Sequence, residues 1–287
     1  MAWFGLSLLT ALCESLKDVF SKKGLRDVDE YVMAWSLRFF ALPFLLPILF
    51  FVKIPDLGNK FWPALLLGGG LNVITTILYM KAIKQSALSL TVPMVAFTPL
   101  FILVTSPLMV GELPNFWGVL SVLFIVAGSY VLNFSARSRG YFAPFRALFK
   151  EAGPRLMLLV AFLWSITANC DKIGVRNSTP LFWSIATTAF MSLVLVLIML
   201  YKSPRAAKQL PAVFKKLIPI GFFCALTVIF QMLAVSLTLV AHVIAIKRTS
   251  TVMSVGWGYL IFNEVGIKER LLGASIMVVG VLVISLF

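Results

Sequence analysis

The chain alternates long apolar segments with short polar links. A membrane-spanning helix needs about 20 apolar residues, and segments of that length recur along the whole chain. They predict transmembrane helices over residues 3–22, 31–52, 62–83, 87–110, 114–134, 155–175, 180–201, 217–237, 240–262 and 268–287. The links are rich in Pro, Gly, Asn and Asp, which favour turns and end helices.

The second half of the chain repeats the first. Residues 69–128 align without a gap on residues 221–280. This register pairs Gly69 with Gly221, Thr75 with Thr227, Tyr79 with Gln231, Glu112 with Glu264 and Gly128 with Gly280. The start of the chain aligns on the second half in the same way and pairs Ser15 with Ser165, Lys22 with Lys172 and Gly24 with Gly174. Internal duplication in an apolar chain is typical of secondary transporters.

The repeat predicts how the chain is organised. Each half has five predicted helices, and because five is odd, the second half enters the membrane from the opposite face. We therefore expect an all-α membrane protein of ten transmembrane helices, built as two five-helix inverted repeats. The repeats span residues 1–134 and 155–287, and a basic loop over 135–154 joins them.

Prolines and glycines within the predicted helices indicate bends and close packing. Pro43 and Pro47 are expected to kink the second helix, and Pro93, Pro99 and Pro107 the fourth. Pro99 pairs with Thr251 in the repeat register, so we expect the two halves to differ in function. The glycines of the third, fifth, eighth and tenth helices are expected to let neighbouring helices approach closely.

Composition confirms that the solvent is a bilayer. Of the 287 residues, 60% are hydrophobic and only 13% are charged, and the mean hydropathy is +0.99, whereas soluble domains are nearer half apolar and a quarter charged. We expect a multi-pass integral membrane protein of the plasma (inner) membrane. The N-terminus lacks a basic region and a cleavage site, and we interpret it as the first membrane helix.

Several function classes are disfavoured. The net charge of +14 comes from short loops between spans, as the positive-inside rule explains, and does not indicate nucleic acid. The three cysteines lie in apolar segments, which suits buried residues and implies no disulfide. One histidine and scattered cysteines cannot supply a metal site. Motifs for ATP binding, ester hydrolysis or redox chemistry are absent, so we expect no enzyme activity and no cofactor.

The loop charges predict an orientation. The side that holds both termini carries few cations, namely Lys53, Lys60, Lys172 and Arg176, and the opposite side carries many more. By the positive-inside rule the second side is cytoplasmic, and both termini face outward.

Lys247 and Arg248 lie within the predicted ninth helix, where each cation costs about 2.5–3.5 kcal/mol unless it is hydrated or paired. Such residues usually face a cavity and mark an ion or substrate path. On a continuous helix the hydroxyls of Ser250, Thr251 and Ser254 share a face with Lys247. We expect this face to cradle a phosphate or carboxylate. In the alternative, Lys247 pairs with a carboxylate of the first helix and Arg248 reaches the membrane surface.

Glu14, Lys17 and Asp18 share one face of the first helix, at i, i+3 and i, i+4 spacing. Two carboxylates in a low dielectric suit a proton-coupling site, and a carboxylate–lysine cluster equally suits an internal salt bridge. Both readings stay open from the sequence.

Other polar residues in the spans are weaker candidates. Lys81 either adds to a cationic ring beside Tyr79 and Gln231 or reaches the membrane surface. Arg38 in the second helix is a lesser candidate for a role in the site. His242, the single histidine, is able to shuttle protons, although a lone histidine is more often structural. Glu112 and Glu264 are expected to cap the fifth and tenth helices near their N-termini.

The segment TPLFILVTSPLMVGELPNFWGVLSVLFIVAGSYVL and its counterpart FNEVGIKERLLGASIMVVGVLVI resemble the repeat ending of EamA-type proteins in the drug/metabolite transporter superfamily. The resemblance covers nearly the whole chain. It implies ten helices, with helices 1–4 and 6–9 around a central cavity, and alternating access by rocking of the halves. Members move amino acids, sugars, nucleotide sugars, sugar phosphates and drugs, so the fold does not name the substrate.

The Lys247–Arg248 pair also resembles the Lys-Arg pair with which plastid phosphate translocators hold phosphate. The end of the first helix, Ser21-Lys22-Lys23, is loosely similar to their Asn-Lys motif. Those translocators place a further lysine where this chain has Val95. The superfamily's usual topology has cytoplasmic termini, which disagrees with the loop charges, and we favour the charges.

The sequence predicts a secondary active transporter of a small anionic or phosphorylated metabolite. Substrate contacts are expected from Lys247, Arg248, Lys81, Tyr79, Gln231, Ser250 and Thr251. Glu14, Lys17 and Asp18 are expected to couple protons or balance charge. Two alternatives remain open. The first is an EamA-type exporter of amino acids or other neutral metabolites, and the second is a lipid-carrier flippase or a non-transporting membrane subunit. A homodimer is compatible with the sequence.

Overall fold

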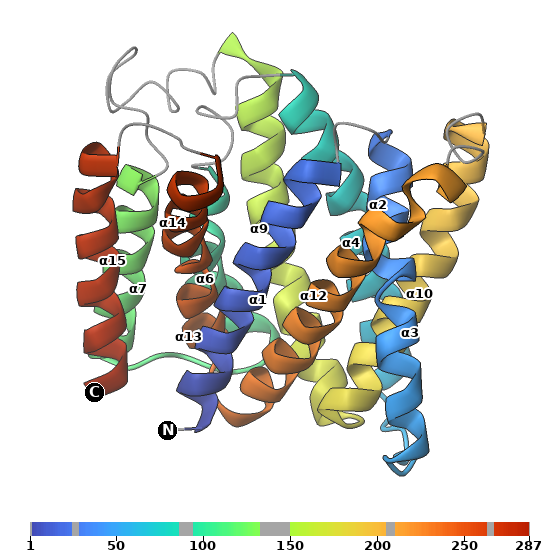
Figure 1. The fold of residues 1–287 in the computed structure, drawn as a ribbon. Helices are drawn as coiled ribbons and strands as arrows, with labels where there is room; N and C mark the ends of the chain where they lie inside the picture. Colours follow the sequence, from blue (N-terminus) through green and yellow to red (C-terminus); the bar gives the residue numbers. More distant parts are fainter. Residues whose placement is uncertain are drawn as a thin grey trace. The chain divides into compact units, whose positions relative to one another are not determined.

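The computed structural model describes residues 2–24, 29–85, 94–132, 150–204, 210–262 and 267–286. Within these ranges the secondary structure is helical and contains no strand. Figure 1 shows the helices α1 (Ala2–Gly24), α2 (Glu30–Phe39), α3 (Leu42–Leu45), α4 (Phe61–Gln85), α6 (Thr98–Met109), α7 (Phe116–Leu132), α9 (Ala152–Arg176), α10 (Pro180–Lys202), α12 (Leu210–Leu237), α13 (Val240–Lys247), α14 (Ser250–Phe262) and α15 (Ile267–Leu286), with the 3-10 helix η1 over Leu46–Phe50.

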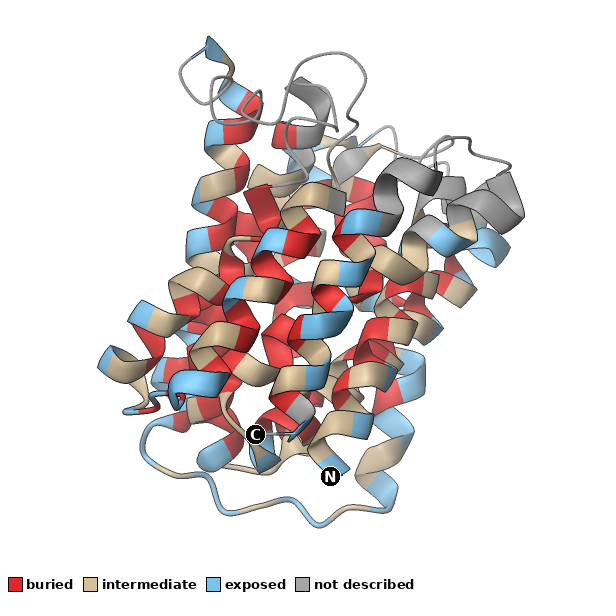
Figure 2. Cartoon of the chain, turned by 90° about the vertical axis from the view of Figure 1, so that its left-hand side faces the viewer, coloured by how far each residue is buried: buried red, intermediate tan, exposed pale blue. Residues whose placement is uncertain are grey.

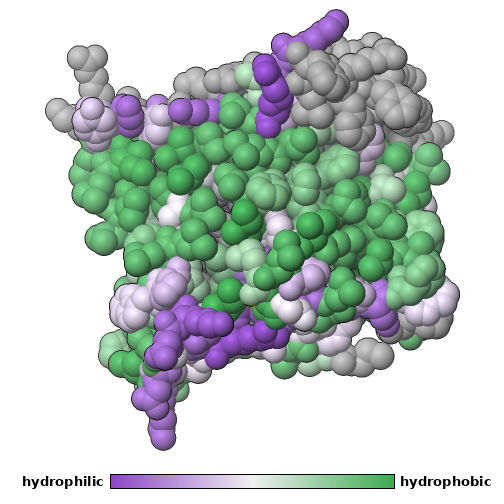
Figure 3. Space-filling view, turned by 180° about the vertical axis from the view of Figure 1, so that it is seen from behind, coloured by the Kyte–Doolittle hydropathy of each residue, from purple (hydrophilic) through white to green (hydrophobic). Residues whose placement is uncertain are grey.

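Five helical segments of the described chain are long and apolar enough to cross a membrane. They are Tyr31–Phe50, Phe61–Tyr79, Ala152–Arg176, Pro180–Lys202 and Phe214–Leu237. Their outer faces expose large apolar side chains: Leu66 is 60% exposed, Leu193 66% and Leu197 63%. Figure 2 shows buried residues on the inward sides of the helices, and Figure 3 shows hydrophobic side chains covering the helix surface. Such a surface needs lipid rather than water around it.

The prolines of the second predicted helix interrupt it, as expected. α2 ends at Phe39, and α3 and η1 follow as short helices with Pro43 and Pro47 in their first turns. Proline fixes φ and has no N–H to give, so it starts a helix more readily than it continues one. In the fourth predicted helix, Pro107 lies inside α6, and Pro93 lies outside the described residues.

The helices form two compact units. The first unit comprises Met1–Ile77 and Cys170–Leu237, and the second comprises Leu78–Asn169 and Thr238–Phe287. Each unit therefore takes helices from both halves of the sequence. The division into repeats over 1–134 and 155–287 remains a prediction.

Close glycine contacts hold the first unit together. α1 packs on α12, and α2 packs on α10. A Cβ on Gly69 of α4 would lie 2.5 Å from the ring of Phe190 in α10, and a Cβ on Gly221 of α12 would lie 2.3 Å from the backbone of Phe40, the C-cap residue of α2. Gly69 pairs with Gly221 in the repeat register, and Phe40 aligns with Phe190 when the register that pairs Ser15 with Ser165 is continued to that residue.

The second unit contains the same kind of reciprocal contact. α7 packs along α15. A Cβ on Gly128 would lie 2.6 Å from Met277, and a Cβ on Gly280 would lie 2.7 Å from Ile125. Gly128 pairs with Gly280 and Ile125 with Met277, so each contact is the counterpart of the other. The expectation that these glycines serve helix packing is confirmed.

Candidate functional site

The predicted ninth helix is broken where its two cations lie. α13 ends at Lys247, Arg248 and Thr249 form a turn, and α14 begins at Ser250. The backbone N–H of Arg248 donates to Ala245 (3.0 Å) and that of Thr249 to Ile246 (2.9 Å), which are the shorter i to i−3 bonds of a tightened turn. The expected shared face of Lys247, Ser250 and Thr251 no longer follows from helical spacing, because the helix does not run through them.

The predicted fourth helix is broken at the equivalent place. Met94 and Val95 are helical, Ala96 and Phe97 form a turn, and α6 begins at Thr98. In the repeat register Ala96–Phe97 pairs with Arg248–Thr249. The bonding is also equivalent, since the Phe97 N–H donates to Met94 (3.2 Å) as the Thr249 N–H does to Ile246. Both breaks lie in the second unit, where α6 packs on α13.

Side-chain hydroxyls sustain the break in the ninth helix. Thr249 Oγ1 donates to the carbonyl of Ile246 (2.7 Å), and Thr251 Oγ1 donates to that of Arg248 (2.7 Å). Such side-chain bonds compete with the helical N–H groups for the backbone carbonyls and often bend a helix. Ser250 is buried and Thr251 is half-buried. Because the Thr251 hydroxyl is the donor in its bond to Arg248, its oxygen can still accept hydrogen bonds.

Arg248 lies over an aromatic ring of α9. Its Cζ is 5.8 Å from the centroid of Trp164, a distance at which the guanidinium is attracted by the ring face. Tyr79 of α4 lies 5.6 Å from the same ring at an interplanar angle of 32°. Arg248, Trp164 and Tyr79 therefore form one cluster in the second unit. Trp164 was not among the predicted site residues. Its pairing with Arg248 spans the repeat, and a tryptophan in an apolar segment gives no sign of that contact.

The remaining predicted substrate contacts are divided between the two units. Lys247 is half-buried at the end of α13, and the Lys81 side chain is exposed on α4. Gln231 is half-buried on α12, in the first unit. Arg38 is half-buried in the last turn of α2, also in the first unit. A role of Gln231 in the site stays a prediction.

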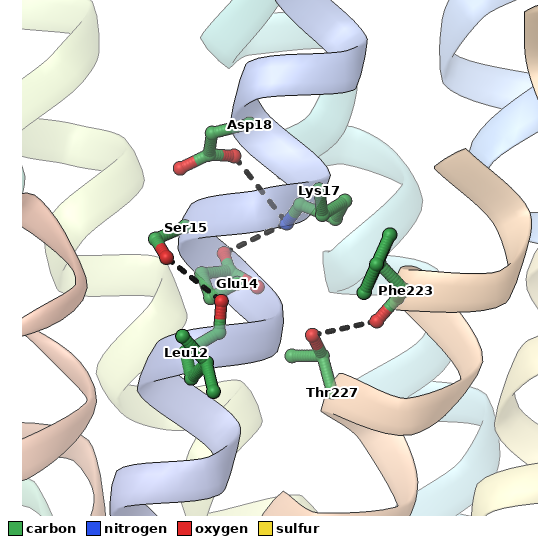
Figure 4. Close-up of polar contacts among 7 residues, drawn as sticks. All are labelled: Leu12, Glu14, Ser15, Lys17, Asp18, Phe223 and Thr227. Carbon is green, nitrogen blue, oxygen red and sulfur yellow. Dashed lines mark hydrogen bonds and ion pairs between the residues drawn. The ribbon is translucent and has the colours of Figure 1, made fainter. Parts of the chain in front are cut away.

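The cluster of the first helix is an ion-pair network. Lys17 Nζ lies 2.7 Å from Glu14 Oε1 and 3.8 Å from Asp18 Oδ1, and Figure 4 shows the ammonium between the two carboxylates. Asp18 is the more exposed partner, at 54% of its side chain against 19% for Glu14. Ser15 of α1 donates to the carbonyl of Leu12, and Thr227 of α12 donates to the carbonyl of Phe223.

Further buried polar residues were missed by sequence reasoning. Trp183 Nε1 donates to Asp171 Oδ1 (2.9 Å), and Lys172 Nζ donates to the carbonyl of Val235. Asp171 and Lys172 are 8% and 5% exposed within α9. Lys172 lies within the predicted helix 155–175, which the structure extends to Arg176, and its side chain is buried there.

In the second unit, Asn169 and Thr105 form another polar contact. Asn169 Nδ2 donates to Thr105 Oγ1 (2.9 Å) and to the carbonyl of Ser165 (2.8 Å). Both side chains are buried. This bond joins α9 to α6. Asn169 lies more than one helical turn after Trp164 along α9.

Glu112 caps a different helix from the one expected. Its Oε2 accepts from the backbone N–H of Val240 at 3.1 Å, so it caps α13 rather than α7. The N-cap residue of α13, Leu239, has no side chain able to do so. Sequence reasoning could not find a partner 128 residues away. Its counterpart Glu264 lies outside the described residues. Among the described residues, no group of three His, Cys, Asp or Glu side chains could hold a metal ion.

Comparisons with known proteins agree with this membrane fold. The model of the EamA-like transporter family matches residues 1–134 and 152–286. A protein of Archaeoglobus fulgidus described as an uncharacterized transporter is 22% identical over 292 residues, which cover 98% of this chain and 94% of that protein. A crystal structure of a protein superposes with a TM-score of 0.71 at 15% identity, covering 99% of this chain and 96% of that one. That similarity is one of fold.

Proposed function

The chain belongs to the EamA-like transporter family, and we propose that it is a secondary active transporter of a small anionic, phosphorylated metabolite. The substrate binds at the helix breaks, and alternating access carries it across the plasma (inner) membrane. One observation carries this proposal: the fourth and ninth helices are interrupted at equivalent positions, and Lys247 and Arg248 stand at one of the interruptions.

Ten spans in two inverted five-helix repeats are part of the proposal. Two repeats related by a two-fold axis make reciprocal contacts. If a residue of the first repeat contacts a residue of the second, their counterparts in the other repeat are also in contact. Gly69–Phe190 with Gly221–Phe40, and Gly128–Met277 with Gly280–Ile125, behave in this way. The family model also matches the chain in two segments that correspond to the two halves.

The helix breaks favour a binding site because interrupted helices in corresponding positions of two repeats are the usual place of substrate in such transporters. In a continuous membrane helix the backbone groups bond to one another and many side chains face lipid. A break leaves some of these groups able to contact a substrate. At this break, however, the N–H groups of Thr251, Val252 and Met253 already donate to carbonyls of the turn. Side chains, rather than the N-terminus of α14, would therefore hold the substrate.

The side chains at the break favour an anion. Lys247 and Arg248 are adjacent cations in a membrane helix, where their cost is offset only by water or by a partner of opposite charge. The Trp164 face orients the Arg248 guanidinium, whose planar donors fit a phosphate or carboxylate. Tyr79 contributes a further ring to the cluster, and Lys81 adds positive charge to the same unit.

We assign the cluster of the first helix to charge balance. Lys17 contacts Glu14 at 2.7 Å and is close to Asp18, so the three groups carry one net negative charge. Proton coupling by Glu14 and Asp18 would require the ion pair to open.

Ligand-induced thermal stabilisation tests the proposal. A ligand that binds only the folded protein raises Tm by mass action. The panel holds inorganic phosphate, glycerol 3-phosphate, hexose phosphates, amino acids and lipid-carrier headgroups. The proteins are the wild type, Lys247→Ala/Arg248→Ala and, as a matched control that removes one exposed cation, Lys53→Ala.

We expect stabilisation by a phosphate compound in the wild type and in Lys53→Ala, and none in the double variant. Stabilisation by amino acids that persists in the double variant would contradict the anion site and favour the exporter of neutral metabolites. Stabilisation by lipid-carrier headgroups would favour the flippase.

A further inference from the structure

A second titratable site lies at the other end of the helix that carries Lys247. Glu112 stands in the link between α6 and α7, just after Gly111, whose φ of 72° suits glycine. The Glu112 side chain is buried, at 7% exposure, and its Oε2 accepts from the first N–H of α13. A buried carboxylate at a helix N-terminus completes the helix only while it can accept that bond.

His242 lies in the same first turn of α13, two residues after Val240. A Cβ on Gly118 of α7 would lie 2.7 Å from His242 Nε2, so the imidazole packs directly against the backbone of α7. The single histidine of the chain and a buried carboxylate thus both lie at the start of α13.

The described helices that pack most on α13 carry few titratable side chains. The helices that pack most extensively on α13 are α6 and α7. α6 carries no titratable side chain, and α7 carries only Tyr130. On α13 itself the other charged residue is Lys247, at the opposite end. Tyr130 and Lys247 are therefore the other titratable residues carried by α6, α7 and α13.

α13 connects this pair to the substrate site. It is an eight-residue helix, about 12 Å long at 1.5 Å per residue. Val240, Ala241, Val243, Ile244, Ala245 and Ile246 are all buried, with exposures of 5% or less. A short, tightly packed helix moves as one piece, so a change of anchoring at Val240 displaces Lys247 and Arg248.

We propose that Glu112 and His242 bind the coupling proton, and that α13 transmits its arrival to Lys247 and Arg248. This rests on the proposed function, because it supplies that transporter with its coupling ion. Proton uptake neutralises the Glu112 carboxylate and replaces a charge-assisted bond to Val240 with a weaker neutral one. The start of α13 loosens, and the cations at its end shift. Proton release restores the cap and returns them.

The test needs no substrate and begins with the histidine itself. Since the chain has one histidine, tag-free protein labelled with ¹³C,¹⁵N-histidine gives a single imidazole signal. We expect its titration midpoint to fall by about one pH unit in Glu112→Gln, which removes the neighbouring negative charge. Asp56→Asn, which neutralises an exposed loop carboxylate, should leave the midpoint in place. An imidazole that does not titrate, or whose midpoint ignores Glu112→Gln, overturns the proton site.

Hydrogen exchange then tests the transmission through α13. After correction for the intrinsic pH dependence, amides of residues 240–249 should exchange about tenfold faster below the midpoint than above it, as expected for loss of one charge-assisted bond. Glu112→Gln should exchange fast at both pH values. Equal protection of these amides at both pH values in the wild type overturns the proposed transmission through α13. The wild-type measurements alone decide this point, even if Glu112→Gln does not fold. If no anion binds in the thermal screen but both signals appear, the substrate proposal fails and the proton site stands.

Discussion

Gly221 of α12 meets the backbone of Phe40, the C-cap residue of α2, so closely that a Cβ on the glycine would lie 2.3 Å from the Phe40 carbonyl group. Real Cβ atoms do not approach backbone atoms at that distance. Gly221→Ala should therefore force the two helices apart, at a cost of about 1–3 kcal/mol in the free energy of unfolding. Chemical unfolding in mixed detergent micelles measures this loss.

Gly70→Ala is the matched control. Gly70 lies in α4 next to the counterpart of Gly221, but a Cβ there meets nothing within 4 Å. Alanine favours helix over glycine by about 1 kcal/mol, so this variant should be as stable as the wild type or more stable. Equal destabilisation by both substitutions would contradict the close contact at Gly221.

Trp183→Phe should destabilise the first unit through its hydrogen bond. The indole N–H donates to Asp171 at 2.9 Å, and the tryptophan is fully buried. Phenylalanine keeps most of the apolar volume and removes the donor, and a hydrogen bond to a charged group contributes about 1.5–3 kcal/mol. The same chemical unfolding measures the loss. Trp62→Phe, at a position 59% exposed, should change stability little, and a comparable loss there would attribute the effect to ring size.

Thr105→Val should weaken the joint between α6 and α9. It leaves one N–H of the Asn169 amide without its acceptor. Hydrogen bonds between membrane helices average about 0.6 kcal/mol and reach about 1.7 kcal/mol, and we expect a loss in that range. Thr76→Val, which removes only a bond to the carbonyl of Asn72 in the same helix, should cost less. The expectation fails if Thr76→Val proves the more destabilising of the two.

Trp164→Leu should weaken substrate binding without removing any charge. A cation–π contact contributes about 0.5–2 kcal/mol, which corresponds to roughly a two- to thirtyfold loss of affinity. Isothermal titration with the phosphate compound found by the thermal screen measures this loss. Trp117→Leu, at a position 42% exposed on α7, serves as the control. Unchanged affinity in Trp164→Leu would show that Arg248 is oriented by other contacts.

The sequence predicts several helix ends but only some of the interruptions. α10 begins at Pro180 and α12 ends at Leu237, both as expected from turn residues and apolar length. The kinks at Pro43 and Pro47 follow from proline chemistry. The break after Lys247 contains neither Pro nor Gly, so the sequence carries no local sign of it. At this break the hydroxyls of Thr249 and Thr251 donate to the carbonyls of Ile246 and Arg248. The repeat register, which places Thr98-Pro99 on Ser250-Thr251, was the available signal.

Long-range contacts explain the rest of what the sequence missed. Glu112 caps α13 instead of the neighbouring α7, and Arg248 lies over Trp164 of α9. Local spacing cannot identify such partners, because they meet only after helices from both halves have packed. Glu14 and Lys17, by contrast, lie one helical turn apart, and their predicted proximity is confirmed.

The central claim is that Lys247 and Arg248 bind the transported anion. Exchange of labelled for unlabelled glycerol 3-phosphate across proteoliposome membranes tests it most directly, with wild type, Lys53→Ala and Lys247→Ala/Arg248→Ala reconstituted to equal density. We predict exchange by the first two proteins and none by the double variant. Exchange by the double variant at the wild-type rate would contradict the account.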